Sequence, residues 1–170
     1  MYSNKTRIVL LGALLCMAFA AFGQELVLGS YNIRYRNDGD ESKGHLWKKR
    51  CQVICDQIHY ELPDAFGAQE VLKEQLDDLL RGLPEYDYVG VGRDDGREAG
   101  EFAPIFYQLE RLVLLSDGYF WLSPNRTKPS LGWDAACIRI CTWAKFKVRK
   151  TGKVFLFFNL HTRSEEHTSE

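Results

Sequence analysis

The stretch Ala65–Val71 (AFGAQEV) decides the fold, because it is a short apolar run that ends on an amide and a carboxylate. Such a run predicts a short buried strand over Ala65–Gln69. Two other apolar runs also end in polar groups: Leu26–Arg34 carries Asn32, and Val154–Thr162 closes on Asn159 and His161. If the three strand ends meet at one rim of a sheet, their amide, carboxylate and imidazole groups can hold a divalent cation beside a phosphoester.

Amphipathic helices are predicted on both sides of this central strand. Apolar residues at helical spacing predict one helix from about Leu46 to Glu61, which Pro63 ends. The same spacing predicts a second helix from about Leu72 to Arg81, with Gly82 as its C-terminal stop. Strands that alternate with helices in this way predict a layered α/β domain.

Beyond Pro84 the pattern changes to strands and hairpins. Short aromatic or β-branched runs predict strands, and turn signals such as Asp117-Gly118 separate them. A long run alternates cleanly between apolar and polar residues, and Thr151-Gly152 turns it into the final strand. The predicted strands are Tyr86–Val91, Ala103–Gln108, Leu112–Ser116, Tyr119–Leu122 and Cys137–Val148. With no repeats and no low-complexity linker, one domain is expected.

The two ends of the sequence differ from this domain. Lys5 and Arg7 precede the apolar run 8–22, and small residues follow at a cleavage site, so residues 1–23 are typical of a secretory signal peptide. A lipoprotein anchor at Cys16 is the alternative, which the bulky Leu15 disfavours. Residues 163–170 resemble a translated sequencing adapter, with a natural acidic tail as the alternative. We therefore expect a truncated domain over 24–162, exported to the periplasm or beyond the cell.

Composition and cysteine spacing exclude some functions. The 170 residues are 45% hydrophobic and 26% charged, which is typical of one globular domain, and the net charge of −1 gives no footprint for tight, non-specific nucleic-acid binding. Four cysteines remain after the expected signal peptide, in two pairs spaced four apart: Cys51 and Cys55, and Cys137 and Cys141. This spacing does not suit a zinc site, and buried apolar roles are favoured over disulfides.

Three motifs resemble those of a known superfamily. Tyr31–Arg34, Gly67–Val71 and Phe158–His161 look like the first three motifs of the endonuclease/exonuclease/phosphatase superfamily. Their order and their positions at strand ends carry the resemblance, which spans about Leu26 to His161. It implies the N-terminal part of a four-layer α/β sandwich (DNase I-like) with an incomplete second sheet. Three intervening segments resemble a secreted bacterial branch closest to deadenylase-like members: Gly92–Gly96, Gly100–Phe102 and Gly132–Ala136.

The resemblance also implies roles for single residues. Glu70 matches the carboxylate that binds Mg²⁺ or Mn²⁺, while Asn32 and His161 match catalytic positions. As alternatives, Glu70 is a strand-end ion-pair partner, Asn32 a turn residue and His161 a satisfied polar group. Three further residues match substrate-binding positions: Glu101, Arg139 and Tyr107.

These three substrate-binding assignments each have an alternative. Glu101 equally suits a solvated loop, and Tyr107 equally suits the core. At Arg139 this sequence departs from the family branch, which tends to have a proline just before the arginine, where Ile138 stands here.

The function implied is metal-dependent phosphoester hydrolysis by in-line attack of water. The substrate class stays open among nucleic acids, nucleotides, phospholipids and sugar phosphates. We expect a monomer with no membrane span and no obligate protein partner. The family's Gly-Asp-x-Asn and Asp-His motifs do not occur in this sequence, so the chain alone is expected to be inactive. The alternative is a non-catalytic binding module with the same fold.

Overall fold

A computed structural model describes residues 26–133 and 135–162. The expected signal peptide (1–23) and the expected adapter-derived tail (163–170) lie outside these residues. Within the described part of the chain, no helix is both long enough and apolar enough to cross a membrane.

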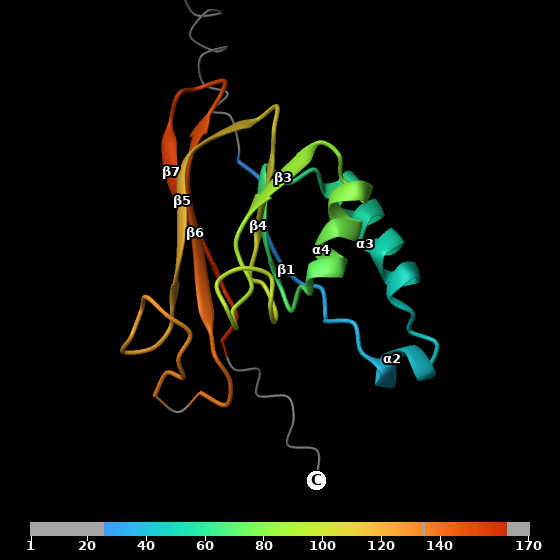
Figure 1. Ribbon diagram of the computed structural model, residues 1–170. Helices are drawn as coiled ribbons and strands as arrows, with labels where there is room; N and C mark the ends of the chain where they lie inside the picture. Colours follow the sequence, from blue (N-terminus) through green and yellow to red (C-terminus); the bar gives the residue numbers. More distant parts are fainter. Residues whose placement is uncertain (1–25, 134, 163–170) are drawn as a thin grey trace, which may run out of the picture.

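Two β-sheets pack face to face, and helices cover the outer face of one of them (Figure 1). The first sheet has the order β1-β2-β4-β3, with β1 parallel to β2 and the other pairs antiparallel. The second sheet is antiparallel, in the order β5-β6-β7. The strands are β1 (Leu28–Asn32), β2 (Ala65–Gln69), β3 (Tyr86–Val89), β4 (Ile105–Gln108), β5 (Leu112–Trp121), β6 (Ile140–Val148) and β7 (Val154–Leu160).

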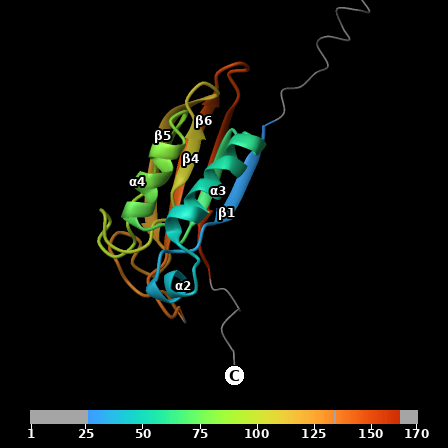
Figure 2. The ribbon, with the colours of Figure 1, turned by 90° about the vertical axis from the view of Figure 1, so that its right-hand side faces the viewer.

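Three helices complete the described residues: α2 (Asp38–Ser42), α3 (Trp47–Glu61) and α4 (Lys73–Gly82). α3 and α4 lie side by side over the first sheet (Figure 2). Within the described ranges, no helix covers the outer face of the second sheet, which has three strands. The predicted α/β sandwich with an incomplete second sheet is therefore confirmed.

Alternation along the central strands divides the core into two layers. Phe66 of β2 and Phe106 of β4 stack at 4.8 Å in the layer beneath the helices. Their neighbours Ala65 and Ile105 point the other way, into the layer between the sheets, where they join Phe146 of β6. Because β2 is buried on both faces, it reads in sequence as a continuous apolar run.

One strand prediction was wrong. Asp117-Gly118 was expected to turn the chain between two strands, whereas β5 runs unbroken through both residues, with a register shift between Leu114 and Ser116. A Cβ atom at Gly118 would lie 2.8 Å from the Trp143 ring on β6. The glycine therefore makes room for a cross-strand ring, and it does not form a turn.

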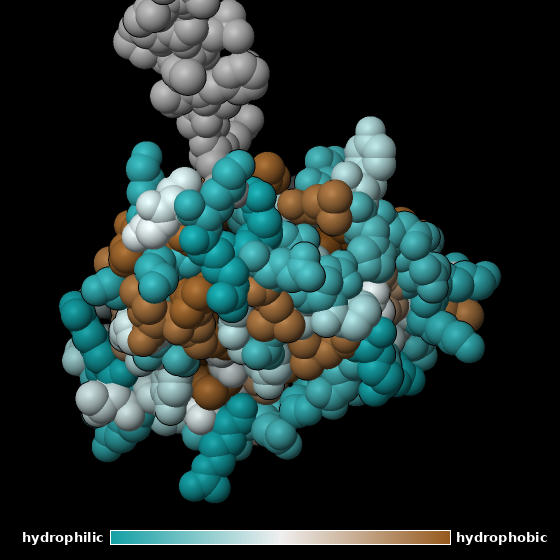
Figure 3. Space-filling model, turned by 90° about the horizontal axis from the view of Figure 1, so that it is seen from above, coloured by the Kyte–Doolittle hydropathy of each residue, from teal (hydrophilic) through white to brown (hydrophobic). Residues whose placement is uncertain are grey.

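The cysteine side chains follow the prediction that buried apolar roles are favoured over disulfides. None of the four cysteines within the described ranges forms a disulfide, and Cys55 and Cys141 are buried as apolar groups. Seen from the end of the sandwich where β6 turns into β7, hydrophobic side chains reach the surface between hydrophilic ones (Figure 3).

Candidate active site

Three strand ends meet at one rim of the sandwich. β1 and β2 are parallel with Asn32 opposite Gln69, so both strands end at the same edge, and Glu70 follows directly. Asn32 Nδ2 donates a hydrogen bond of 2.9 Å to Glu70 Oε1. His161 follows β7 of the other sheet, and its Nε2 lies 3.9 Å from the same oxygen. The structure thus brings Asn32, Glu70 and His161 together.

Glu70 is held in an unusual backbone conformation. Its φ of 60° lies in the left-handed region, which a non-glycine residue adopts at a cost and which is frequent at functional sites. The second carboxylate oxygen, Oε2, accepts a hydrogen bond of 3.2 Å from the backbone N–H of Tyr35. With one oxygen bound to Asn32 and the other to Tyr35, the carboxylate has a fixed orientation.

The helices hold the chain segment that follows β1. Gln75 of α4 is fully buried, and its amide bridges the backbone of Arg36 and Arg34 at 3.0 and 3.2 Å. Arg50 of α3 donates to the carbonyls of Ile33 and Arg34 at 2.8 and 3.0 Å. The backbone N–H of Arg34 in turn donates to Asn32 Oδ1 at 2.9 Å. The position of the Asn32 amide therefore depends on both helices.

Arg139 sets the tautomer of His161. Its Nη1 lies 3.2 Å from His161 Nδ1, and a guanidinium only donates hydrogen bonds, so Nδ1 must accept. The remaining ring proton then lies on Nε2, on the side of Glu70. Burial, followed by the positive charge of Arg139, lowers the pKa of His161, which favours the neutral imidazole. The site thus presents a neutral N–H donor beside a fixed carboxylate.

Glu101 also lies at this rim. Its Oε2 is 4.0 Å from His161 Nδ1 and 2.8 Å from Nη1 of Arg93, a residue that the sequence analysis did not assign. Arg93, Glu101, Arg139 and His161 line one narrow recess. Two of the three expected substrate-binding residues, Glu101 and Arg139, are therefore at the site.

Tyr107, the third expected substrate-binding residue, lies elsewhere. It pairs with Ala65 at the start of β2, because β4 runs antiparallel to β2. The distance from there to Glu70 along the strand is roughly 16 Å, at about 3.3 Å per residue. The Tyr107 hydroxyl donates to Asp87 at 3.3 Å, and burial raises its pKa to about 12. Tyr107 is a core aromatic, and the expectation that it lies in the site is corrected.

The residue that joins the two sheets behind the site is one that the sequence analysis placed at a strand end but gave no role. Asn159 of β7 donates to the carbonyls of Ala68 and Pro104 at 2.7 and 2.8 Å, and it accepts from Gln69 Nε2 at 2.7 Å. A Cβ at Gly67 would lie 2.5 Å from Asn159 Cγ, so this approach requires glycine. Because His161 lies two residues further on, these bonds also place the imidazole opposite Glu70.

The rim fits one mode of cation binding. Within the described residues, no group of three or more His, Cys, Asp or Glu side chains is arranged to hold a metal ion. A dedicated cage of side chains is therefore not present in that part of the chain. Mg²⁺ is commonly held by one or two carboxylates together with waters and a substrate phosphate. Glu70, with its carboxylate fixed in place, fits that mode.

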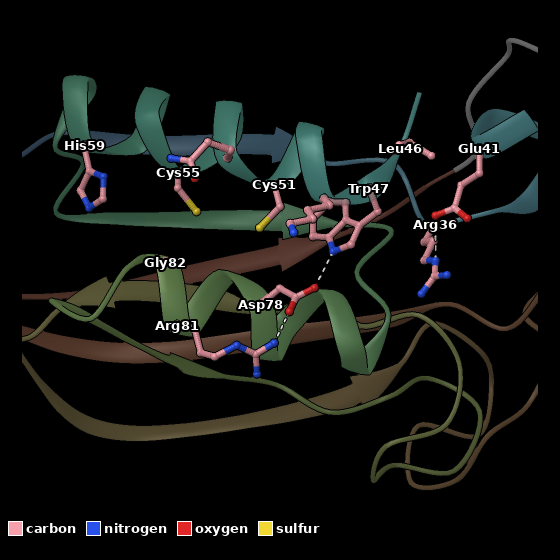
Figure 4. Close-up of a pocket in the computed structure, with 12 residues that line it drawn as sticks. Arg36, Glu41, Leu46, Trp47, Cys51, Cys55, His59, Asp78, Arg81 and Gly82 are labelled. Atoms are coloured by element: carbon pink, nitrogen blue, oxygen red, sulfur yellow. Dashed lines mark hydrogen bonds and ion pairs between the residues drawn. The ribbon is translucent and has the colours of Figure 1, made fainter. Parts of the chain in front are cut away.

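A larger cavity of about 750 Å³ lies apart from the rim, between α3 and α4 (Figure 4). The Cys51 and Cys55 thiols point toward α4 there, and the Trp47 indole donates to Asp78 at 2.7 Å. Arg36 of the segment after β1 lines this cavity, but the candidate site residues do not: Asn32, Glu70, Glu101, Arg139 and His161. It is therefore a separate feature of the helix layer.

The chain is similar to known proteins over most of its length. It is 47% identical to an endonuclease/exonuclease/phosphatase family protein from Bacteroides thetaiotaomicron, with a TM-score of 0.79, covering 80% of this chain and 50% of that one. It is also 47% identical to a mannosyl-6-phosphatase from Bacteroides thetaiotaomicron VPI-5482, with a TM-score of 0.79, covering 81% of this chain and 51% of that one.

A more distant relative is viral. An uncharacterised protein of Acanthamoeba polyphaga mimivirus is 30% identical over 122 residues, which are 68% of this chain and 46% of that protein. The chain thus spans about half the length of these relatives. No family model matches it. From the shared fold and the identity to the two Bacteroides structures, the chain belongs to the endonuclease/exonuclease/phosphatase superfamily, with a DNase I-like fold.

Proposed function

We propose that the chain supplies the metal-binding and phosphate-contacting residues of a metal-dependent phosphoester hydrolase. The observation that carries the proposal is the meeting of Asn32, Glu70 and His161 at one rim. Glu70 would bind Mg²⁺ or Mn²⁺, with Asn32 fixing its carboxylate. When bound, the cation would polarise a phosphoryl oxygen and acidify an attacking water.

His161 and Arg139 have complementary tasks in this proposal. The Nε2–H of His161 donates to a non-bridging phosphoryl oxygen, which gains negative charge in the transition state. Arg139 keeps that proton on Nε2, because it donates to Nδ1. The lowering of the His161 pKa favours a role as a neutral hydrogen-bond donor over a role as a cation.

We further propose a phosphorylated sugar as the substrate. The 47% identical relative is described as a mannosyl-6-phosphatase, and a net charge of −1 does not favour long duplex DNA. The signal peptide expected over residues 1–23 supports an exported enzyme, in which this reaction would release sugar and phosphate outside the cytoplasm.

The full reaction needs more than these residues. The sequence contains neither the Gly-Asp-x-Asn nor the Asp-His motif that orients and deprotonates the attacking water in this superfamily. We therefore expect the purified chain not to hydrolyse bis-p-nitrophenyl phosphate. Mg²⁺-dependent release of p-nitrophenol by the chain would contradict this expectation and leave the metal site in place.

Metal binding tests the proposal without requiring turnover. Titration of the chain with Mn²⁺, followed by calorimetry or water-proton relaxation, is expected to show one site. Glu70→Gln is expected to weaken it by at least about tenfold, because the metal loses its carboxylate ligand. The matched control is Glu74→Gln, which removes an exposed carboxylate on α4 and is expected to change nothing. Equal Mn²⁺ affinity in the two variants would refute the metal site.

A further inference from the structure

Arg93 is a partly buried charged residue at the rim to which the proposed mechanism gives no task. It lies on the loop between β3 and β4, and its side chain is 18% exposed. Its Nη1 binds Glu101 at 2.8 Å. Its Nε is buried and has no hydrogen-bond partner, and Oδ1 of Asp94 lies 3.6 Å from it. A buried donor without an acceptor is costly, so this arginine is held in place at the expense of stability.

The loop around Arg93 is rigidly braced. The backbone N–H of Arg93 donates to the Glu101 carbonyl at 3.1 Å, and Trp121 Nε1 donates to the Arg93 carbonyl at 2.7 Å. Gly96, with a φ of 69°, packs beneath the Trp121 ring. A side chain on such a loop is positioned before any ligand arrives, which lowers the entropy cost of binding.

Two guanidinium groups therefore lie beside one small recess, next to the Nδ1 side of the His161 ring. Arg93 and Arg139 line the same recess as His161, and Glu101 is the acidic residue that lines it with them. Glu101 is ion-paired to Arg93, so the positive charge of Arg139 is not matched within the recess. The recess therefore has a net positive charge, which attracts a dianion more strongly than a monoanion.

We propose that Arg93 and Arg139 together bind a terminal phosphate group, and that this pair selects phosphomonoesters over phosphodiesters. The proposal rests on the proposed function and narrows its substrate class. A phosphomonoester carries a charge of about −1.5 to −2 at neutral pH and has three free oxygens. A phosphodiester has one charge and two free oxygens, so it offers the two guanidinium groups less negative charge and fewer acceptors. Planar guanidinium groups also match phosphate geometry well.

Binding of two small probes tests this selection. Methyl phosphate and dimethyl phosphate are titrated into the chain at about pH 8, above the second phosphate pKa of about 6, with EDTA present to exclude metal. The chain is expected to bind methyl phosphate at least about tenfold more tightly than dimethyl phosphate. Arg93→Gln is expected to remove most of this difference. The matched control, Arg97→Gln, changes an exposed arginine of the same loop and is expected to have no effect.

A double variant separates phosphate contact from a purely structural role. If Arg93 only neutralised Glu101, the variant carrying both Arg93→Gln and Glu101→Gln would recover wild-type affinity for methyl phosphate. If Arg93 contacts phosphate, the double variant stays as weak as Arg93→Gln. Circular dichroism and urea unfolding of each variant verify that it is folded.

Three outcomes would overturn the proposal: no methyl phosphate binding by the unmodified chain, equal affinity for the two probes, or recovery in the double variant. These outcomes are distinct from failure of the proposed function. If they occurred while Mn²⁺ binding still depended on Glu70, the metal site would stand and the arginine pair would fall. If the chain bound methyl phosphate selectively but its Mn²⁺ binding did not depend on Glu70, the arginine pair would stand and the metal site would be refuted.

Discussion

The two sheets differ in how many of their faces are covered. In the first sheet, every residue of β2 is buried, because helices lie on one side and the second sheet on the other. In the second sheet, β7 alternates between inward residues and an outer apolar stripe, whose members are 39% to 55% exposed: Val154, Leu156, Phe158 and Leu160. Apolar residues in a strand therefore mark a core only where another layer covers them.

This difference matters because the candidate site lies where the two sheets meet. Asn32 and Glu70 belong to the sheet that is covered on both sides, whereas His161 and Arg139 come from the second sheet. The separation of 3.9 Å between His161 and Glu70 is therefore a distance between two layers. Whatever holds the layers together also sets the geometry of the site.

The largest predicted effect on stability comes from comparing a phenylalanine in the covered first sheet with one on the exposed face of the second sheet. Phe106 is fully buried and stacked on Phe66, so Phe106→Ala is expected to lower the free energy of unfolding by about 3–5 kcal/mol. Phe158 on the outer stripe is 53% exposed, so Phe158→Ala is expected to cost less than about 1 kcal/mol. Urea unfolding measures both. Similar costs, with a midpoint that depends on protein concentration, would mean that self-association covers the outer stripe in solution.

The second largest predicted effect concerns the hydrogen bonds by which Asn159 joins the two sheets. Asn159→Ala leaves two buried carbonyls without their donor, and we expect a loss of about 3 kcal/mol. Gln69→Ala removes the third bond of Asn159 and two longer bonds from the same amide, to Ser30 Oγ and the Gly67 carbonyl, and we expect a loss of about 1–2 kcal/mol.

Two checks accompany this pair of variants. Asn125→Ala is the surface control, since that amide accepts from Thr127 within an exposed turn, and a loss of about 0.5 kcal/mol or less is expected. A larger loss for Gln69→Ala than for Asn159→Ala would show that the carbonyl bonds are not the main link between the sheets.

Much of the fold was predictable because its signals are local. The apolar run over Ala65–Gln69 gave β2 its observed bounds, and helical spacing placed α3 and α4 to within one residue at each end. The split of β5 failed for the opposite reason. Asp-Gly favours a turn locally, but Trp143 on the neighbouring strand requires the small residue at 118. That cause lies far away in the sequence.

The site follows the same division between local and distant causes. Polar residues at strand ends, combined with the family resemblance, pointed to Asn32, Glu70 and His161. Neither signal revealed that Asn159 joins the two sheets, through partners as many as 91 residues away, or that Arg93 lies in the same recess as His161. Tyr107 was misplaced because the pattern of a strand does not tell its direction in the sheet.

The smallest predicted effect uses one buried thiol from each region. Burial raises the pKa of Cys55, which faces α4, from 9.0 to about 12, and it raises the pKa of Cys141 in β6 from 9.0 to about 11. A raised folded-state pKa gives stability that is fully present below about pH 9 and is lost as the pH rises through the folded-state value. Above about pH 9, each thiol therefore makes the free energy of unfolding fall with rising pH by at most about 1.4 kcal/mol per pH unit.

The slope of the free energy of unfolding against pH, measured between about pH 8 and pH 10, separates this ionisation effect from the effect of packing. Cys55→Ala and Cys141→Ala each remove a buried side chain, which shifts stability at every pH, but only the loss of the thiol flattens the alkaline slope. Cys141 lies in the sheet with one uncovered face, yet it is only 2% exposed, against 4% for Cys55. If the two variants reduce the alkaline slope equally, the surroundings of Cys141 in the second sheet exclude water as well as those of Cys55 in the helix layer. An unchanged slope in Cys141→Ala alone would show that water reaches β6, and that the two layers holding the site differ in stability as well as in coverage.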